Sequence, residues 1–95
     1  MSDAEKLFAR AGILGVDFEG FFKMIVKQAE NGEEAYNRLR KTTEDYFQSA
    51  IEKAKDNLQL QNELKNKRLE ALKELDAGRS AIIAMGDAEV IIAVF

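Results

Sequence analysis

Residues 33–77 constrain the fold of this chain most, because they contain neither glycine nor proline. Strong helix formers dominate the stretch, and Gly78 follows where a helix commonly takes a left-handed residue at its end. One continuous helix over these residues would measure roughly 65 Å at 1.5 Å per residue. A compact domain of this size has a radius of gyration of only about 12 Å. Such a helix therefore needs a partner helix, which we expect from a second copy of the chain.

The apolar residues of this stretch recur along one helical face, in part at intervals of eleven: Tyr36, Leu39, Phe47, Leu58, Leu69 and Leu72. An eleven-residue repeat is typical of a straight helix or a slight right-handed supercoil. Polar residues interrupt the face at Gln61, Asn62 and Lys65. Either this polar layer fixes the register of one long helix in a coiled coil, or the chain turns back near Asp56-Asn57. We expect the continuous helix, because neither glycine nor proline marks a turn.

Residues 1–32 predict a short helical hairpin arm that precedes the long helix. Ser2 and Glu5 form a capping-box pattern, and Asp17 is a typical residue to begin a second helix. An apolar stripe with helical spacing follows: Phe18, Phe21, Phe22 and Ile25. The ordinary interpretation is that this stripe packs on the first turns of the long helix. The alternative is that it binds a groove on a partner protein.

Residues 78–95 form an apolar segment of different composition, rich in β-branched residues and nearly free of charge. Gly86-Asp87 separates two apolar runs, a pattern that predicts a small β-hairpin, with a last helix capped by Ser80 as the alternative. In either form we expect the large side chains of the segment to be buried against the helices or against other subunits, which makes it an oligomerisation or docking segment. The side chains in question are Ile82, Ile83, Ile91, Ile92 and Phe95.

The composition argues against most kinds of chemistry. The chain has no His and no Cys, so it lacks the usual general base, the usual metal ligands and any disulfide. With 17 acidic and 14 basic residues the net charge is −3, which gives no electrostatic footprint for nucleic acid. We expect no signal peptide and no membrane-spanning segment, and hence a cytoplasmic protein or one assembled in a virion.

Charged residues at helical spacing are the remaining candidates for a site. The carboxylate pairs Glu52/Asp56 and Glu70/Glu74 lie among lysines, so surface charge balance explains them better than a metal. Arg38, Arg40 and Lys41 are candidates for binding a small anion between subunits, although a solvated helix face is the more ordinary interpretation. We therefore predict no catalytic residue, no metal and no cofactor.

The sequence thus predicts a mainly α protein, with short N-terminal helices packed on a long amphipathic helix in a coiled coil or bundle. We expect a non-enzymatic homo-oligomer with a structural or assembly role, or one in protein interaction. One alternative is a small adaptor or inhibitor that binds another protein through its phenylalanine helix or its C-terminal strands. The other is an oligomer that sequesters a ligand in interface pockets.

Overall fold

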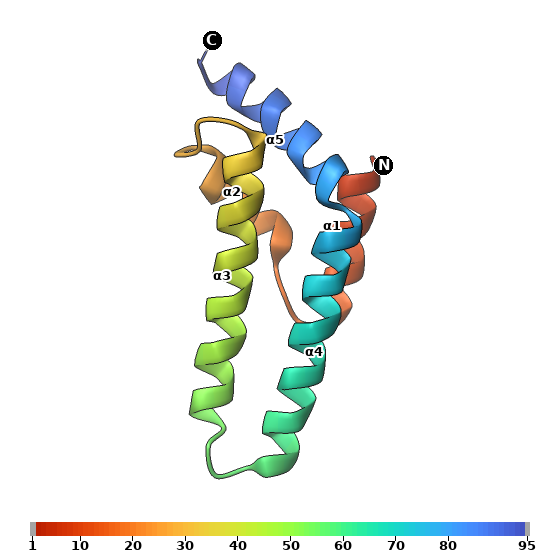
Figure 1. The fold of residues 1–95 in the computed structure, drawn as a ribbon, viewed down its shortest axis with the longest axis vertical. Helices are drawn as coiled ribbons and strands as arrows, with labels where there is room; N and C mark the ends of the chain where they lie inside the picture. Colours follow the sequence, from red (N-terminus) through yellow and green to blue (C-terminus); the bar gives the residue numbers. More distant parts are fainter. Residues whose placement is uncertain (1, 95) are drawn as a thin grey trace.

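The computed structural model describes the backbone of residues 2–94 and the side chains of residues 2–90. These residues form five helices, α1 (Asp3–Ile13), α2 (Phe18–Val26), α3 (Gly32–Lys53), α4 (Leu58–Ala77) and α5 (Arg79–Val94). The mainly helical fold is therefore confirmed, and the described residues contain no strand. The molecule is elongated, with extents of 49 × 24 × 16 Å. Helices α3 and α4 run side by side along its length (Figure 1).

Helix starts follow local capping signals in the sequence. The Ser2 hydroxyl accepts a hydrogen bond from the Glu5 N–H, and the Glu5 carboxylate accepts one from the Ser2 N–H, so the predicted capping box is confirmed. The Asp17 carboxylate accepts from the Gly20 N–H and begins α2, as expected. Between α1 and α2 the chain turns at Gly15, whose φ of 79° is a conformation that favours glycine.

The prediction of one continuous helix over residues 33–77 is wrong, because the chain turns back between Lys53 and Leu58. The Asn57 side chain accepts a hydrogen bond from the Leu60 N–H at 3.0 Å and begins α4. No residue of this turn has a positive φ, so glycine is not required there and its absence carried no information. The turn lets the apolar faces of α3 and α4 pack on each other, which removes the need for a second chain to cover them.

The predicted β-hairpin in the C-terminal segment is not seen, because residues 79–94 form α5. Gly86 lies where α5 crosses the start of α3, and a Cβ atom built on it would lie 2.8 Å from the Cα of Gly32. The Asp87 carboxylate accepts a hydrogen bond from the Gly32 N–H at 2.6 Å. The Gly-Asp pair therefore brings two helices close together and caps one of them, a use of glycine that does not involve positive φ.

Gly78 shows the same use of glycine at the end of α4. The helix ends at Ala77 as expected, but the φ of Gly78 is −97°, outside the left-handed region. A Cβ atom at Gly78 would collide with the Leu7 side chain of α1. The missing side chain thus allows α1 to pack against the junction between α4 and α5.

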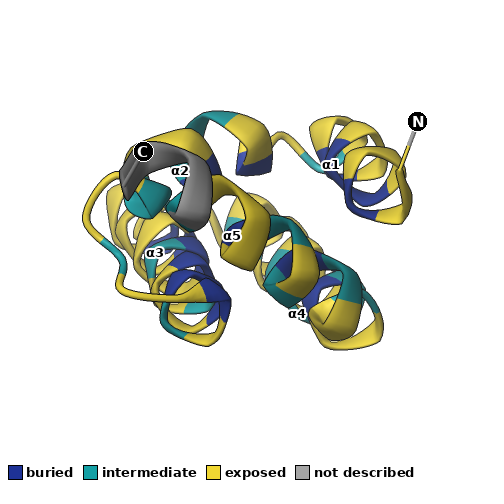
Figure 2. Ribbon diagram, turned by 90° about the horizontal axis from the view of Figure 1, so that it is seen from above, coloured by how far each residue is buried: buried dark blue, intermediate teal, exposed yellow. Residues whose placement is uncertain are grey.

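The core lies at the end of the molecule where all five helices meet. Its most buried large side chains come from every helix: Leu7, Phe18, Leu39, Leu75 and Ile82. Aromatic rings of α1 and α2 contact one another, with the Phe8 and Phe22 centroids 5.5 Å apart. Figure 2 shows α1 and α2 together on one side of the layer that α3 and α4 form. The other side of that layer carries none of the short N-terminal helices.

Among the described residues, no helix combines the length and the apolar character needed to cross a bilayer.

Candidate protein-interaction surface

Several residues expected at an interface between subunits lie instead inside this chain. Tyr36, Leu39, Phe47 and Ile82 are each at most 3% exposed, so they pack within one molecule. Leu72 and Ile83 are half-buried, and Ile91, Ile92 and Phe95 lie outside the residues whose side chains are described. Two of the expected residues remain accessible to a partner: Leu58, 72% exposed, and Leu69, 53% exposed.

The phenylalanine stripe faces the core. Phe18 and Phe22 are buried, and Phe21 and Ile25 are half-buried. The Phe21 ring contacts the ring of Tyr46 on α3, with centroids 6.0 Å apart. A partner protein would therefore reach Phe18 and Phe22 only if α2 moved away from the rest of the molecule.

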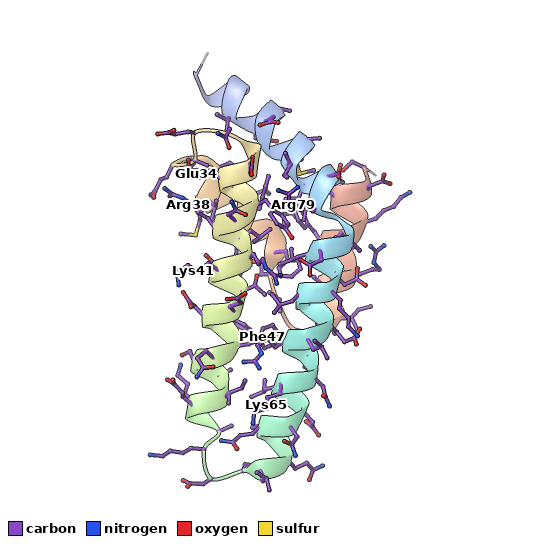
Figure 3. All side chains as sticks on the ribbon, in the orientation of Figure 1. Glu34, Arg38, Lys41, Phe47, Lys65 and Arg79 are labelled. Carbon is purple, nitrogen blue, oxygen red and sulfur yellow. The ribbon has the colours of Figure 1, made fainter. Side chains whose placement is uncertain are left out.

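The three candidate anion-binding residues each contact a carboxylate on the same helix. Arg38 pairs with Glu34 at 2.6 Å, and Lys41 pairs with Asp45 at 3.6 Å. Figure 3 shows Glu34, Arg38 and Lys41 along the outer part of α3. Arg40 lies 3.9 Å from Glu44 and also reaches Asp76 on α4, at 3.1 Å. Their positive charges are thus balanced by neighbouring acids, and they do not converge on one point.

A polar cluster joins α3, α4 and the start of α5. The Tyr36 hydroxyl donates a hydrogen bond to Asp76 at 3.1 Å, and the guanidinium of Arg79 lies over the Tyr36 ring, 5.4 Å from its centroid. Burial, followed by the interactions with Asp76, raises the pKa of Tyr36 above its ordinary value. The phenol is therefore held neutral and acts as a hydrogen-bond donor, which fits a role in fixing α4 against α3.

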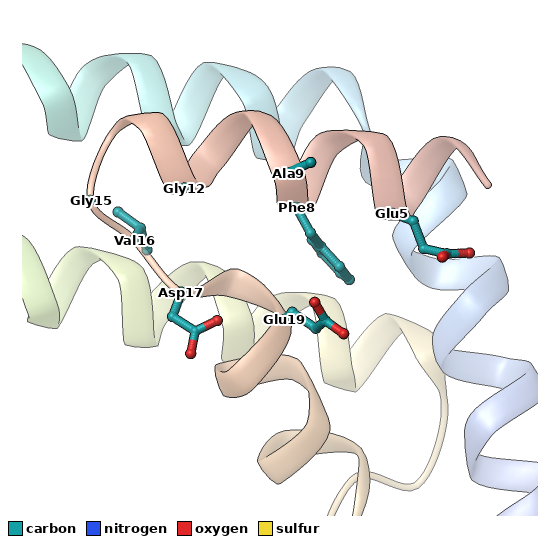
Figure 4. A pocket seen from close by; sticks show the side chains of 8 residues that line it. All are labelled: Glu5, Phe8, Ala9, Gly12, Gly15, Val16, Asp17 and Glu19. Atoms are coloured by element: carbon teal, nitrogen blue, oxygen red, sulfur yellow. The ribbon is translucent and has the colours of Figure 1, made fainter. Parts of the chain in front are cut away.

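A cleft of about 390 Å³ lies between α1 and the start of α2 (Figure 4). Phe8 projects across it toward Glu19, and Glu5 lies at its edge. Its three carboxylates are occupied by local structure: Glu5 by Ser2, Asp17 by the Gly20 N–H and Glu19 by Lys23. Hydrogen bonds from Ser2 are the main cause that lowers the pKa of Glu5. Within the described part of the chain, no group of three potential metal ligands is found.

A second groove, of about 620 Å³, runs between α3 and α4 around the middle of the hairpin. The α3 wall contributes Glu44, Asp45 and Gln48. The α4 wall contributes Lys65, Asn66, Arg68, Leu69 and Leu72. One wall is thus acidic and the other basic, with leucines on the basic side.

The position of Tyr46 shows which side of the layer carries this groove. The Tyr46 hydroxyl donates a hydrogen bond to the Gly15 carbonyl at 2.9 Å, so Tyr46 points toward α1 and α2. Two residues correspond to about 200° of a helix, so Glu44 and Gln48 point to the opposite side. On α4, Leu69 is likewise two residues from the buried Ala71, so the Leu69 side chain points away from the side of α4 that Ala71 occupies. The groove therefore lies on the uncovered side of the hairpin.

Leu58 lies on the same side of α4 as Leu69, because eleven residues correspond to about three turns. We define the uncovered hairpin face as these two leucines together with the walls of the groove. Sequence reasoning identified both leucines but placed them in one stripe with Tyr36 and Phe47. The turn at residues 54–57 breaks the helical spacing between α3 and α4. Tyr36 and Phe47 on α3 therefore face inward, whereas Leu58 and Leu69 on α4 face outward. Nothing in the local sequence marks the acidic wall as part of this surface.

Comparison of the chain with protein-family models, with curated proteins and with solved structures gave no match.

Proposed function

We propose that this chain is a non-enzymatic assembly protein that associates with further copies of itself through the uncovered hairpin face. The observation that carries the proposal is the exposure of Leu58 and Leu69, 72% and 53%, on one side of α4. Burial of a leucine side chain contributes about 1.5–3 kcal/mol relative to leaving it exposed. Two such residues aligned on one helix therefore provide a driving force for association.

The non-enzymatic role is supported by the composition and by the polar groups of the described residues. The chain has no His or Cys to act as nucleophile or general base. The carboxylates of the cleft between α1 and α2 cap helices or pair with a lysine. An adaptor that binds through the phenylalanine stripe has less support, because Phe18 and Phe22 are buried.

The test measures solution mass by light scattering coupled to size exclusion, over a range of protein concentrations. We expect the wild-type chain to form an oligomer that dissociates on dilution. The double variant Leu58→Ser/Leu69→Ser should stay a monomer at concentrations where the wild type is associated.

Leu60→Ser is the matched control, because Leu60 is also exposed, at 40%, but lies about 200° around α4 from Leu58. This variant should associate like the wild type, and circular dichroism should show all variants folded. A wild-type chain that is monomeric at every concentration would contradict the proposal. So would a Leu60→Ser variant that dissociates as fully as the double variant.

A further inference from the structure

The two walls of the groove carry opposite charges, and this difference has a consequence for how two copies would meet. We infer that the assembly unit is a dimer with its two-fold axis parallel to the hairpin, so that both α3–α4 loops lie at the same end. This inference rests on the proposed function and adds the arrangement of the partner. In this dimer the two uncovered hairpin faces pack together into a four-helix bundle.

The face is large enough for a specific dimer. Helices of this length extend about 30 Å, and two helices side by side are about 20 Å wide. The face therefore covers about 600 Å² per copy, near the roughly 800 Å² per partner of a typical specific interface. Because α1 and α2 lie on the other side of the layer, they leave this face open to a second hairpin (Figure 2).

The basic wall has charges without partners. Within the described residues, neither Lys65 nor Arg68 forms an ion pair, although the groove brings both to the level of the acidic wall. On the acidic wall, Glu44 and Asp45 each have one long ion pair on their own helix, with Arg40 at 3.9 Å and with Lys41 at 3.6 Å. The basic wall thus keeps charge that the acidic wall of a second copy could neutralise.

Two hairpins can meet face to face around two kinds of two-fold axis. An axis perpendicular to the hairpin places α3 on α3 and α4 on α4, so acidic wall meets acidic wall and basic wall meets basic wall. An axis parallel to the hairpin places α3 of each copy on α4 of the other and keeps every residue at its own level. Glu44 then lies near the level of the other copy's Arg68, and opposite charges meet along both seams. Like charges across an interface disfavour association, so the charges select the parallel axis.

The first test uses the absence of native cysteine. Lys55→Cys places a single thiol in the loop between α3 and α4. In the parallel dimer two such thiols lie close together, so a short thiol-specific bifunctional reagent should convert most of the protein to covalent dimer. In the perpendicular arrangement they lie at opposite ends, and cross-links should form only between a Lys55→Cys chain and an Asn37→Cys chain.

The second test reverses one wall. Glu44→Lys/Asp45→Lys puts positive charge on both walls, which in the parallel dimer replaces attraction by repulsion and should raise the dissociation constant about tenfold. In the perpendicular arrangement the same change replaces one like-charged seam by another and should leave affinity unchanged. Glu63→Lys/Glu70→Lys is the matched control, because it changes net charge equally at exposed residues of α4 outside the groove. The control should associate like the wild type.

The outcomes separate the two proposals. Cross-linking through Lys55→Cys together with weakening by the reversed acidic wall supports the parallel dimer. An oligomer by light scattering that does not cross-link through residue 55 overturns the parallel arrangement and leaves the proposed function standing. So does an oligomer whose dissociation constant is unchanged by Glu44→Lys/Asp45→Lys. A monomer overturns both.

Discussion

The two ends of the molecule are built differently, although the same two helices run through both. At the end where five helices meet, side chains from every helix are almost fully buried. Toward the loop only two helices remain, and none of residues 55–70 is buried. Local burial governs local stability, so the five-helix end should hold the fold while the two-helix stem follows it. The stem in turn keeps exposed helix surface, whereas the corresponding surface at the five-helix end is buried between helices.

The helix starts at the two ends differ in the same way. At the five-helix end, two side chains cap α3: Asn31 accepts from the Glu34 N–H and Asp87 from the Gly32 N–H. At the stem, the start of α4 has the single cap of Asn57. The start of α3 thus has an acceptor distant in sequence besides its local cap, whereas the start of α4 has only a contact within three residues. Substitutions at the five-helix end should therefore affect the stability of the whole fold, whereas the effects of substitutions in the stem should stay local.

The largest expected difference comes from removing a large apolar side chain at each end. Phe18→Ala should lower the free energy of unfolding by about 3–5 kcal/mol, because it leaves a cavity at a fully buried site. Leu58→Ala removes an exposed side chain and should change the free energy of unfolding by less than about 0.5 kcal/mol. Urea unfolding followed by circular dichroism, at a concentration where the chain is monomeric, measures both. Similar losses for the two variants would show that the stem is packed as firmly as the five-helix end.

The next effect concerns the glycines. Gly86→Ala should destabilise the fold by about 1–3 kcal/mol, because the new Cβ would press against the backbone of Gly32. Gly12→Ala is the control: its Cβ would meet no atom within 4 Å, and alanine favours helix over glycine by up to about 1 kcal/mol. Thermal unfolding should therefore move in opposite directions for the two variants. A neutral Gly86→Ala would mean that α5 does not cross α3 this closely.

Removal of the stem cap should have a smaller and local effect. Asn57→Ala leaves the Leu60 N–H without its side-chain acceptor and should cost about 1 kcal/mol. Hydrogen exchange should accelerate for the first amides of α4, while the amides around Leu39 keep their protection. Uniform acceleration along the chain would instead show that the stem and the five-helix end unfold as one unit.

The smallest effect is a pH dependence at the polar cluster. The pKa of Tyr36 is raised in the folded state, so its neutral form contributes stability that is present below its ordinary pKa of about 10. That contribution is lost as the pH rises through the folded-state pKa. The wild type should therefore lose more stability than Tyr36→Phe when alkaline unfolding is followed above pH 10. Parallel curves for the two proteins would mean that Tyr36 does not titrate differently in the two states.

The sequence predicted the parts of the fold that depend on neighbours along the chain. Ser2, Asp17 and the phenylalanine spacing act within one or two helical turns, and the structure agrees with each. The turn before Asn57 was predicted only as the alternative to a continuous helix, because no residue in it has a positive φ, whereas the usual turn signals are glycine and proline. Gly86-Asp87 was misread because its partner, Gly32, is more than fifty residues away in the chain. A local pattern cannot report such a contact.

The candidate surface was predicted only in part, for a related reason. Leu58 and Leu69 were identified from a regular spacing, but the same spacing also selected Tyr36 and Phe47, which are buried. Whether an apolar residue faces inward depends on where the chain turns, and that depends on packing between α3 and α4. The charged walls of the groove come from residues brought together by the same turn. The opposite charges of the two walls can be recognised only once α3 and α4 are placed side by side.

The bond from the Gly32 N–H to Asp87 also bears on the order of events during synthesis. Chains emerge from the N-terminus at about 5–20 residues per second, and local structure can form as they do. Here the start of α3 obtains this acceptor only when α5, which follows the other four helices in the sequence, has been made. Until then, the site on α3 that receives α5 stays exposed to water. A growing chain therefore has most of its helices before it has the contact that closes them, and its final fold is set late.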